Sequence, residues 1–258
     1  MKVIKELYSY REMIFSLVRK DLRGRYKGSV LGFLWTFVNP LLQLAVYSFV
    51  FAFILRADID KFYLFLFVAL IPWLFFSSCI TSGSFCILGE KGLITKIYFP
   101  REVLPIAWVT SAFVNMLLCF LVVFAVVLFS GAHVNFAVWL FLIPVAFIEY
   151  LLALGFTLIF SAATVYFRDL QHILGILSMA WMYFTPVVYP EEIIPEQFRA
   201  MFSLNPMTPI IRAYRDILYY ARIPDMFTLL SALACGVIGV FVGFFVFNKL
   251  KRGFAEEM

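Results

Sequence analysis

The chain has 258 residues, of which 64% are hydrophobic, 19% aromatic and only 14% charged. One soluble domain of this length could not bury so much apolar surface, so the composition excludes it. The formal net charge of +5 collects at the ends of apolar segments, where anionic lipid headgroups explain it better than nucleic acid does. We therefore expect an integral membrane protein that contacts membrane lipids and has no nucleic-acid partner.

The first predicted element is an amphipathic helix over residues 10–27. Ile14 and Leu22 recur on one face at helical spacing, while Arg19 and Arg23 lie on the other face. Such a helix lies in the plane of the membrane interface. The alternative is a solvated basic tail, which would leave the apolar stripe in water.

Six stretches then follow that are apolar and long enough to span a membrane, which takes about 20 residues. They cover about residues 30–55, 62–88, 104–130, 136–166, 170–189 and 225–248. With a cytoplasmic amino terminus, 15 Lys and Arg residues fall on the inner side and 6 on the outer side. Because basic residues favour the cytoplasmic side, we expect a multi-pass protein with both termini in the cytoplasm.

Residues 190–224 carry too many charges to form a lipid-exposed span. Pro195 is a favourable first-turn residue for a short helix through Ser203, and Thr208 starts a second helix through Tyr220. We expect an outer helical hairpin between the fifth and sixth spans that dips back into the membrane where protein shields it. A simple surface loop is the alternative.

Together these elements predict an all-α integral membrane protein with one domain over residues 1–258. It would contain six transmembrane helices, an amino-terminal amphipathic interfacial helix and an outer re-entrant helical hairpin.

Motifs for catalysis and for nucleotide or metal binding are absent from the sequence. It contains no G-x-x-x-x-G-K-[ST] loop, no G-x-G-x-x-G and no H-E-x-x-H. The two histidines, His133 and His172, are predicted near opposite membrane faces and cannot share a metal. The four cysteines lie inside apolar stretches, where we expect them to pack as small apolar side chains: Cys79, Cys86, Cys119 and Cys235. We expect a transporter with no catalytic residue, metal or cofactor on this chain.

Glu149 is the one carboxylate predicted in mid-span, and an intramembrane charge is a candidate for function. Asn115 on the third span lies at a similar predicted depth. A structural Glu149–Asn115 hydrogen bond, or a protonated Glu149, is one interpretation. A role in the substrate path is the other.

Five segments of the sequence carry a resemblance to a known family. They are KDLRGRYKGSVLGFLWTFVNPLL, GEKGLITKIYFPREVLP, VYFRDLQHILGI, TPVVYP and LNPMTPIIRAYRDILY. In matching order they resemble the ABC-2 type permeases of polysaccharide exporters. The O-antigen (lipopolysaccharide) exporters are most similar, the teichoic acid exporters come next, and the capsule exporters are more distant.

The resemblance implies a permease of a bacterial inner (plasma) membrane that works as a homodimer. Two copies of a separate ABC ATP-binding subunit would bind ATP and magnesium and drive transport. The cargo implied is an undecaprenyl-diphosphate-linked polysaccharide, moved outward from the cytoplasmic side. The ABC-2 fold also implies an inner interfacial helix and outer gate helices, which match residues 10–27 and 190–224.

The inner loop over residues 90–101 is the segment that we expect to couple the ATPase to the membrane. A short helix over 90–98 would end before Pro100, and apolar side chains would seat it in the ATPase. The alternative is a basic inner turn without a partner. The candidate coupling residues are Glu90, Leu93, Ile94, Ile97, Tyr98, Phe99 and Arg101. Arg168 and Asp169 would form a second contact or a local salt bridge.

Aromatic rings on the first and fifth spans, which resemble the channel-lining helices of the family, are candidates for the substrate path. They are Trp35, Phe37, Tyr47, Trp181, Tyr183 and Phe184. A sliding glycan would lay the apolar faces of its sugars on such rings. Lipid contact or packing is the alternative for each ring.

Two sets of charged residues complete the candidate sites. Arg23, Arg25 and Lys27 would attract the diphosphate headgroup at the inner surface, with anionic lipid as the equal alternative. Arg212, Arg215 and Asp216 would form contacts between subunits at the outer gate, or would be solvated.

Two other classes of protein compete with the permease interpretation. An ion-gradient-driven flippase for lipid-linked sugars would have internal repeats and several buried ionisable groups, but the chain shows no obvious repeat and one mid-span carboxylate. A membrane enzyme acting on lipid-linked sugars would show clustered carboxylates or a metal constellation at one membrane face, and the sequence shows neither.

Overall fold

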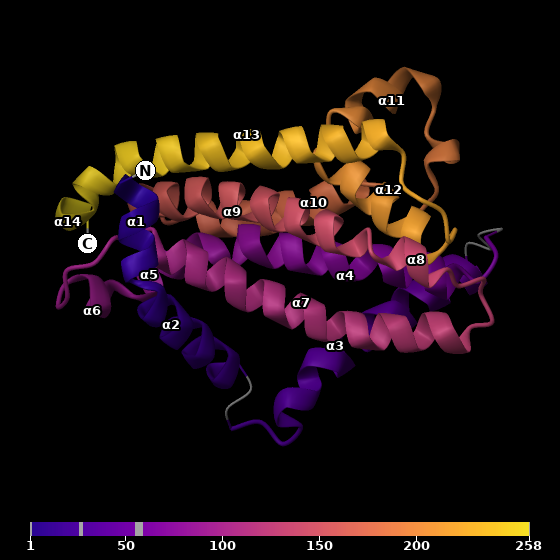
Figure 1. Ribbon diagram of the computed structural model, residues 1–258, viewed down its shortest axis with the longest axis horizontal. Coiled ribbons are helices and arrows are strands. Elements are labelled where there is room, and N and C mark those ends of the chain that lie inside the picture. Colours follow the sequence, from indigo (N-terminus) through magenta and orange to yellow (C-terminus); the bar gives the residue numbers. More distant parts are fainter. Residues whose placement is uncertain (1, 26–27, 55–58, 258) are drawn as a thin grey trace.

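The protein folds as a bundle of long helices. The structure, a computed structural model, describes residues 2–25, 28–54 and 59–257, and these residues form helices and no strands. Five helical segments are long and apolar enough to cross a membrane: Gly32–Ala52, Phe62–Gly89, Val103–Phe129, Phe136–Tyr166 and Met226–Gly253. Long helices run along the long axis of the molecule (Figure 1). The prediction of an all-helical protein with several membrane spans is confirmed.

The first half of the chain forms two amino-terminal helices, two spans and a short inner helix. Its elements are α1 (Lys2–Ser9), α2 (Arg11–Gly24), the 3-10 helix η1 (Gly32–Leu34), α3 (Trp35–Ser48), the π-helix η2 (Phe49–Ile54), α4 (Phe62–Thr81), the 3-10 helix η3 (Gly83–Phe85), α5 (Cys86–Gly89) and α6 (Lys91–Ile94).

The second half adds three long helices and the shorter helices between them. Its elements are α7 (Val103–Phe129), α8 (Phe136–Trp139), α9 (Leu142–Tyr166), α10 (Leu170–Tyr183), the 3-10 helix η4 (Glu191–Ile193), α11 (Glu196–Ser203), α12 (Met207–Leu218), α13 (Met226–Leu250), the 3-10 helix η5 (Lys251–Gly253) and α14 (Phe254–Glu257).

Helix α2 is the amphipathic helix predicted over residues 10–27, the last two of which lie outside the described ranges. Its apolar Met13, Ile14 and Leu17 pack against the core, while Phe15 is exposed. Figure 1 shows α2 running obliquely to the long helices. One face of α2 therefore covers the bundle and the other remains open.

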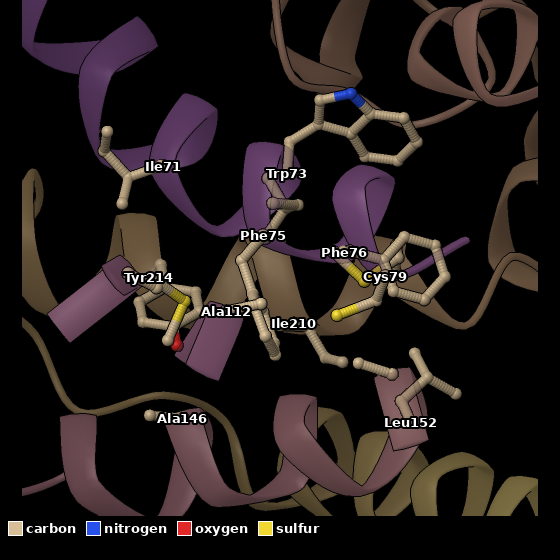
Figure 2. Packing of buried hydrophobic residues seen from close by; sticks show 14 of the residues in the cluster. Ile71, Trp73, Phe75, Phe76, Cys79, Ala112, Ala146, Leu152, Ile210 and Tyr214 are labelled. Atoms are coloured by element: carbon tan, nitrogen blue, oxygen red, sulfur yellow. The ribbon is translucent and has the colours of Figure 1, made fainter. Parts of the chain in front are cut away.

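Helix α4 forms the centre of the bundle. It is apolar on all sides, and 15 of its 20 residues are buried, as expected for a helix surrounded by others. Figure 2 shows side chains of α4, among them Trp73 and Phe76, close to residues from α7, α9 and α12. Cys79 lies in this core, and Cys86 and Cys119 are buried as well.

Helices α9 and α13 approach each other through glycines. A Cβ atom added to Gly155 would lie 2.3 Å from the carbonyl carbon of Gly239, and one added to Gly243 would lie 2.6 Å from the carbonyl oxygen of Gly155. Only two backbones in direct contact give such distances, and small residues are what permits this contact between membrane helices. The last span is therefore packed closely on α9.

The predicted fifth span, residues 170–189, contains the 14-residue helix α10. At 1.5 Å per residue, α10 is about 21 Å long, which is shorter than the hydrocarbon core of about 30 Å. Beyond Tyr183 the chain turns through Thr185 and Pro186, because proline cannot continue a helix. Among the described residues, five helical segments are thus long and apolar enough to span a membrane, and the sixth span stays a prediction.

The connections gather at two ends of the bundle. Both termini, α5 and α6 lie at one end, which we call the inner end after its predicted orientation, and α8, α11 and α12 lie toward the opposite, outer end (Figure 1). Helices α11 and α12 form the hairpin predicted over residues 195–220. The predicted break at residues 130–135 separates α7 from α8.

Replacing Gly155 with alanine should destabilise the protein, because the new Cβ must displace the backbone of α13. We expect a loss of about 1–3 kcal/mol, measured as a lower thermal unfolding midpoint of the purified protein in detergent. The matched control is Gly175→Ala in α10, where nothing lies within 4 Å of the added Cβ and alanine favours the helix. Equal midpoints for the two variants would contradict the close approach of α9 and α13.

Candidate functional site

The inner end presents an exposed loop between α5 and α7. Tyr98 is 89% exposed and Ile97 is 54% exposed, whereas Phe99 is only 6% exposed. Leu93 and Ile94 pack partly against the core. Of the predicted coupling residues, three apolar side chains therefore anchor the loop to the bundle, and two are displayed outward.

The predicted helix over residues 90–98 is wrong in its length. Helix α6 has four residues, and only hydrogen-bonded turns follow it, such as the one from Ile97 N to Leu93 O at 3.1 Å. Gly92 weakens the helix, and the Thr95 hydroxyl donates to the carbonyl of Lys91 at 3.1 Å, a local bond that competes with helix continuation. Pro100 favours an extended backbone just before it.

The carboxyl-terminal turn braces this loop. Arg101 donates to the carbonyl of Lys251 at 2.5 Å, and the Lys251 ammonium pairs with Glu102 at 2.5 Å. Glu102 is buried, so this ion pair compensates a charge that would otherwise be costly. The loop, Lys251 and Glu6 of α1 line a cavity of about 520 Å³. The carboxyl-terminal turn thus holds the loop at the end that leads into α7.

Arg168 and Asp169 lie in the turn between α9 and α10. Both are exposed, and they do not pair with each other in the part of the chain that the structure describes. Of the two predicted alternatives, the local salt bridge is therefore not formed. A second contact with a partner stays a prediction.

Asp21 holds α2 onto α7. It accepts hydrogen bonds from the Ser111 hydroxyl of α7 and from Arg25 Nε, the latter at 2.8 Å. The adjacent residue, Lys20, pairs with Glu90 at 2.7 Å. Helix α2 thus links the residue that precedes α6 to the first third of α7, a pair of contacts that the sequence did not predict.

The three cations predicted to attract a headgroup have different surroundings. Arg23 is exposed on α2, and Lys27 lies outside the described residues. Arg25 pairs with Asp21, and its guanidinium carbon lies 5.4 Å from the ring centroid of Trp108. Its Nη2 atom is buried with no hydrogen-bond partner among the described residues. Arg25 is therefore the cation with a fixed orientation and a free donor.

The aromatic candidates of the first span lie along α3. The indole nitrogen of Trp35 donates to Ser29 at 2.9 Å, and Phe37 meets Phe33 edge to face with ring centroids 5.6 Å apart. The hydroxyl of Tyr47 lies 4.0 Å from the sulfur of Met182 on α10. These contacts orient the rings and leave their role in a substrate path a prediction.

The aromatic candidates of α10 divide into two groups. Trp181 points into the bundle, where it donates to Asn205 at 3.0 Å and lies edge to face with Phe76 and Phe156. Packing is the role that this geometry supports for Trp181. Tyr183 is 54% exposed and Phe184 is 51% exposed, so both rings are available to another molecule.

The three predicted gate residues on α12 all have partners within the chain. Arg215 and Asp216 are buried, so the solvated alternative is wrong for these two, whereas Arg212 is partly exposed. Contacts between subunits stay a prediction. Arg212 forms a two-pronged ion pair with Glu191, and this hydrogen bonding raises the pKa of Arg212. Asp216 is buried and pairs with Arg222 at 2.6 Å.

Arg215 is buried at the outer end of the bundle. Its guanidinium carbon lies 3.6 Å from the ring centroid of Phe65, and one nitrogen donates to the carbonyl of Val187 at 2.6 Å. Arg215 therefore fastens α12 to α4 and to the segment after α10, because a buried guanidinium needs acceptors within the protein.

Asn205 links α10 and the segment that follows it to α12, and the sequence did not predict this role. Its amide donates to the carbonyl of Phe184 and to the Thr185 hydroxyl, both at 2.8 Å, and its oxygen accepts from Trp181 and from Met207 N. The N-P pair at 205–206 indicates a turn in the sequence, but it does not reveal this network.

The predicted pairing of Glu149 with Asn115 is wrong. Glu149 is fully buried on α9 and accepts a hydrogen bond from the Tyr214 hydroxyl of α12 at 2.8 Å. The ring of Tyr214 stacks on Phe120 of α7, with centroids 5.4 Å apart. Depth along two spans does not reveal which faces meet, and the predicted dip of the outer hairpin did not identify a partner for Glu149. Glu149 thus ties the outer hairpin to the bundle.

These features define a class of protein: a multi-span helical membrane protein with an exposed loop at one end and a braced hairpin at the other. The family model described as ABC-2 type transporter matches residues 12–219. The chain belongs to the ABC-2 type transporter family, as the sequence motifs predict.

Curated relatives match over nearly the whole chain. The O-antigen export system permease protein RfbA of Myxococcus xanthus is 36% identical over 260 residues, covering 100% of both chains. A protein of the same name from Klebsiella pneumoniae is 34% identical and covers 95% of this chain and 94% of the relative. The polysialic acid transport protein KpsM of Escherichia coli is 23% identical, covering 92% and 93%.

Replacing Tyr214 with phenylalanine should destabilise the protein, because the buried Glu149 loses its hydrogen-bond donor. We expect a loss of about 1–3 kcal/mol, measured as a lower thermal unfolding midpoint in detergent. The control is Tyr150→Phe, which removes a hydroxyl that is hydrogen-bonded to Thr110 at 2.9 Å without leaving a carboxylate unpaired. A Tyr214→Phe midpoint no lower than that of the control would contradict the tether.

Proposed function

We propose that this chain is the membrane permease of an ATP-driven exporter that moves an undecaprenyl-diphosphate-linked polysaccharide outward across the bacterial inner membrane. O-antigen is the best-supported cargo. The observation that carries this choice is the end-to-end similarity, at 36% and 34% identity, to proteins named as O-antigen export permeases.

We propose an assembly of two copies of this chain with two ATP-binding subunits. The sequence has no phosphate-binding loop, so ATP and magnesium would bind to the partner. The outward-facing Ile97 and Tyr98 offer that partner an apolar contact, and the anchors of the loop to α2 and to Lys251 support a role in transmitting force. Arg168 and Asp169 would extend the contact.

The whole chain, residues 1–258, would form one ABC-2 membrane domain with six crossings and both termini in the cytoplasm. Helix α10 and residues 184–189 would make the fifth crossing. The hairpin of α11 and α12 would be re-entrant, which is supported by the contact of Tyr214 with Glu149. Glu149 lies seven residues after the start of α9, or about 10 Å along its axis.

Within a homodimer, Trp35, Phe37 and Tyr47 on α3 would line the sugar path together with two exposed residues at the end of α10, Tyr183 and Phe184. Aromatic rings accept the apolar faces of sugars without fixing one position, which suits a polymer that must slide. The internal packing of Trp181 argues against giving it the same role.

Capsular polysaccharide is a second candidate cargo because the polysialic acid transport protein of Escherichia coli also matches over 92% of this chain. Its lower identity of 23% ranks it behind O-antigen. An ion-gradient-driven flippase has less support, because Glu149 is engaged with Tyr214 rather than with a chain of ionisable groups.

The proposed cargo is tested in cells. The gene, expressed together with a gene for its ATP-binding partner, should restore O-antigen on the surface of a strain that lacks its own O-antigen permease. Surface O-antigen is measured as the lipopolysaccharide ladder on a gel. Rescue of a capsule permease mutant without rescue of the O-antigen mutant would reject O-antigen in favour of capsule.

Replacing Ile97 and Tyr98 with aspartate should uncouple the ATPase, because two charges would face the proposed apolar cleft. We expect export to fall by at least tenfold and the ATP-binding subunit to be lost on purification. The control is Leu204→Asp, which puts a charge on an exposed apolar residue of the outer hairpin. Normal export and retained ATPase in the double variant would reject the coupling role.

The proposed orientation predicts which positions react with a membrane-impermeant maleimide. In a Cys235→Ser background, where the three remaining native cysteines are buried, Gly131→Cys should label on intact cells. Arg168→Cys should label only after the membrane is opened. The opposite pattern would reverse the assigned topology.

A further inference from the structure

A polar cleft lies between α3, α4 and α7, helices that are otherwise apolar. Its volume is about 230 Å³. Seven residues whose side chains carry polar nitrogen or oxygen atoms contribute to its lining: Arg25, Trp35, Thr36, Asn39, Gln43, Ser78 of α4 and Asn115. Arg25 follows α2, the next four come from α3, and Asn115 comes from α7.

The cleft reaches deep into the bundle. Asn115 lies twelve residues after the start of α7, or about 18 Å along the helix. Gln43 lies eight residues after the start of α3, or about 12 Å along its axis. Amide side chains at such depth are costly in hydrocarbon unless they have partners.

Several polar groups of the cleft lack a partner within the described chain. Arg25 Nη2 and the Thr36 hydroxyl are buried and unpaired there. The amide nitrogen of Asn115 reaches only the sulfur of Cys119, at 3.9 Å, and sulfur is a weak acceptor. A polar ligand would satisfy these groups together.

The lining indicates the chemistry of that ligand. A guanidinium whose Nε is held by Asp21 keeps a fixed donor for an oxyanion, and arginine is well suited to phosphate. The amides of Asn39, Gln43 and Asn115 can bond hydroxyl groups as donor and acceptor, and the Trp35 ring can cover the apolar face of a sugar. Together these groups fit a sugar joined to a phosphate.

The surroundings of the cleft fit a lipid carrier. Leu42 and Val46, on the same helix as Asn39 and Gln43, are exposed, so an apolar chain can run along α3. Toward the inner surface, Arg25 also lines a second cavity of about 550 Å³, together with Lys20 and Gln171. Arg25 thus stands between an inner-surface cavity and the polar cleft.

We propose that this cleft binds the glycosyl phosphate end of a polyprenyl-linked saccharide, with the phosphate on Arg25 and the first sugar against Asn39, Gln43 and Asn115. The proposal rests on the proposed export function and assigns it a binding site within one protomer, behind α3.

The test measures binding to the full-length protein in nanodiscs of uncharged lipid. The probes are farnesyl diphosphate with and without a linked N-acetylglucosamine. Arg25→Gln should weaken both probes about tenfold. Asn115→Leu should weaken the sugar-bearing probe about fivefold and leave the other unchanged. The charge-matched control is Arg19→Gln, an exposed position on α2, which should stay within twofold of the wild type.

If Arg25→Gln does not fold, as judged by its thermal midpoint, Arg25→Lys takes its place and should weaken both probes by at least threefold. Equal binding by the Arg25 and Arg19 variants would overturn the phosphate assignment. An equal effect of Asn115→Leu on both probes would overturn the sugar assignment. Displacement of both probes by phosphatidylglycerol or by millimolar inorganic phosphate would show a general anion site and overturn the proposal.

Two outcomes distinguish failure of the proposed binding site from failure of the proposed export function. A wild-type protein that exports glycan in cells but binds neither probe would overturn the cleft alone. A protein that binds both probes, with the variant effects stated above, but restores no glycan export would overturn the export function alone.

Discussion

Polar groups inside a bundle of apolar helices must find their partners within the protein, because hydrocarbon offers none. Most of the buried polar contacts here follow from this constraint. Glu149 takes the hydroxyl of Tyr214, Arg215 takes a carbonyl after α10, and Asp21 takes the hydroxyl of Ser111. Each contact joins elements that are distant in sequence. The need to pair buried polar groups therefore helps to determine how the apolar helices are arranged relative to one another.

The same constraint makes the two ends of the molecule different. At the outer end, Arg212, Arg215 and Asp216 are all engaged with groups of the same chain, so α12 is fastened to the bundle. At the inner end, the anchors lie at the base of the loop before α7, and Ile97 and Tyr98 remain outside. An outer end held by contacts within the chain and an inner loop with exposed apolar side chains are consistent with the proposed contact of an ATP-binding subunit at the inner end.

Apolar length and charge breaks predicted the spans well, because both properties are local. Five predicted spans agree with helical segments such as Val103–Phe129 and Phe136–Tyr166 to within a few residues. The span at 170–189 was harder to predict because Pro186 stops α10 early. The inner helix was overestimated because Gly92 and Thr95 limit it to α6.

Contacts between spans could not be predicted in the same way. Asn115 and Glu149 share a similar depth, but helix rotation turns Asn115 toward α3 and Glu149 toward α12. An apolar helix surrounded by apolar neighbours carries little periodicity to reveal its rotation. The partner of Glu149 lies in the outer hairpin, and the predicted dip of that hairpin into the membrane did not reveal which of its residues would reach α9.

Helix α2 connects the inner loop to the polar cleft. Lys20 holds Glu90, which directly precedes α6, and the next residue, Asp21, holds Arg25, which lies one turn further on and lines the cleft. Because a helix is stiff over one turn, a displacement of the loop would shift α2 and carry the Arg25 guanidinium with it. Asp21 also accepts a hydrogen bond from Ser111 of α7, so such a motion would displace α2 relative to α7. Under the proposed coupling role, a displacement of the loop would reach Arg25, which lines the cleft, through the contacts of Lys20 and Asp21.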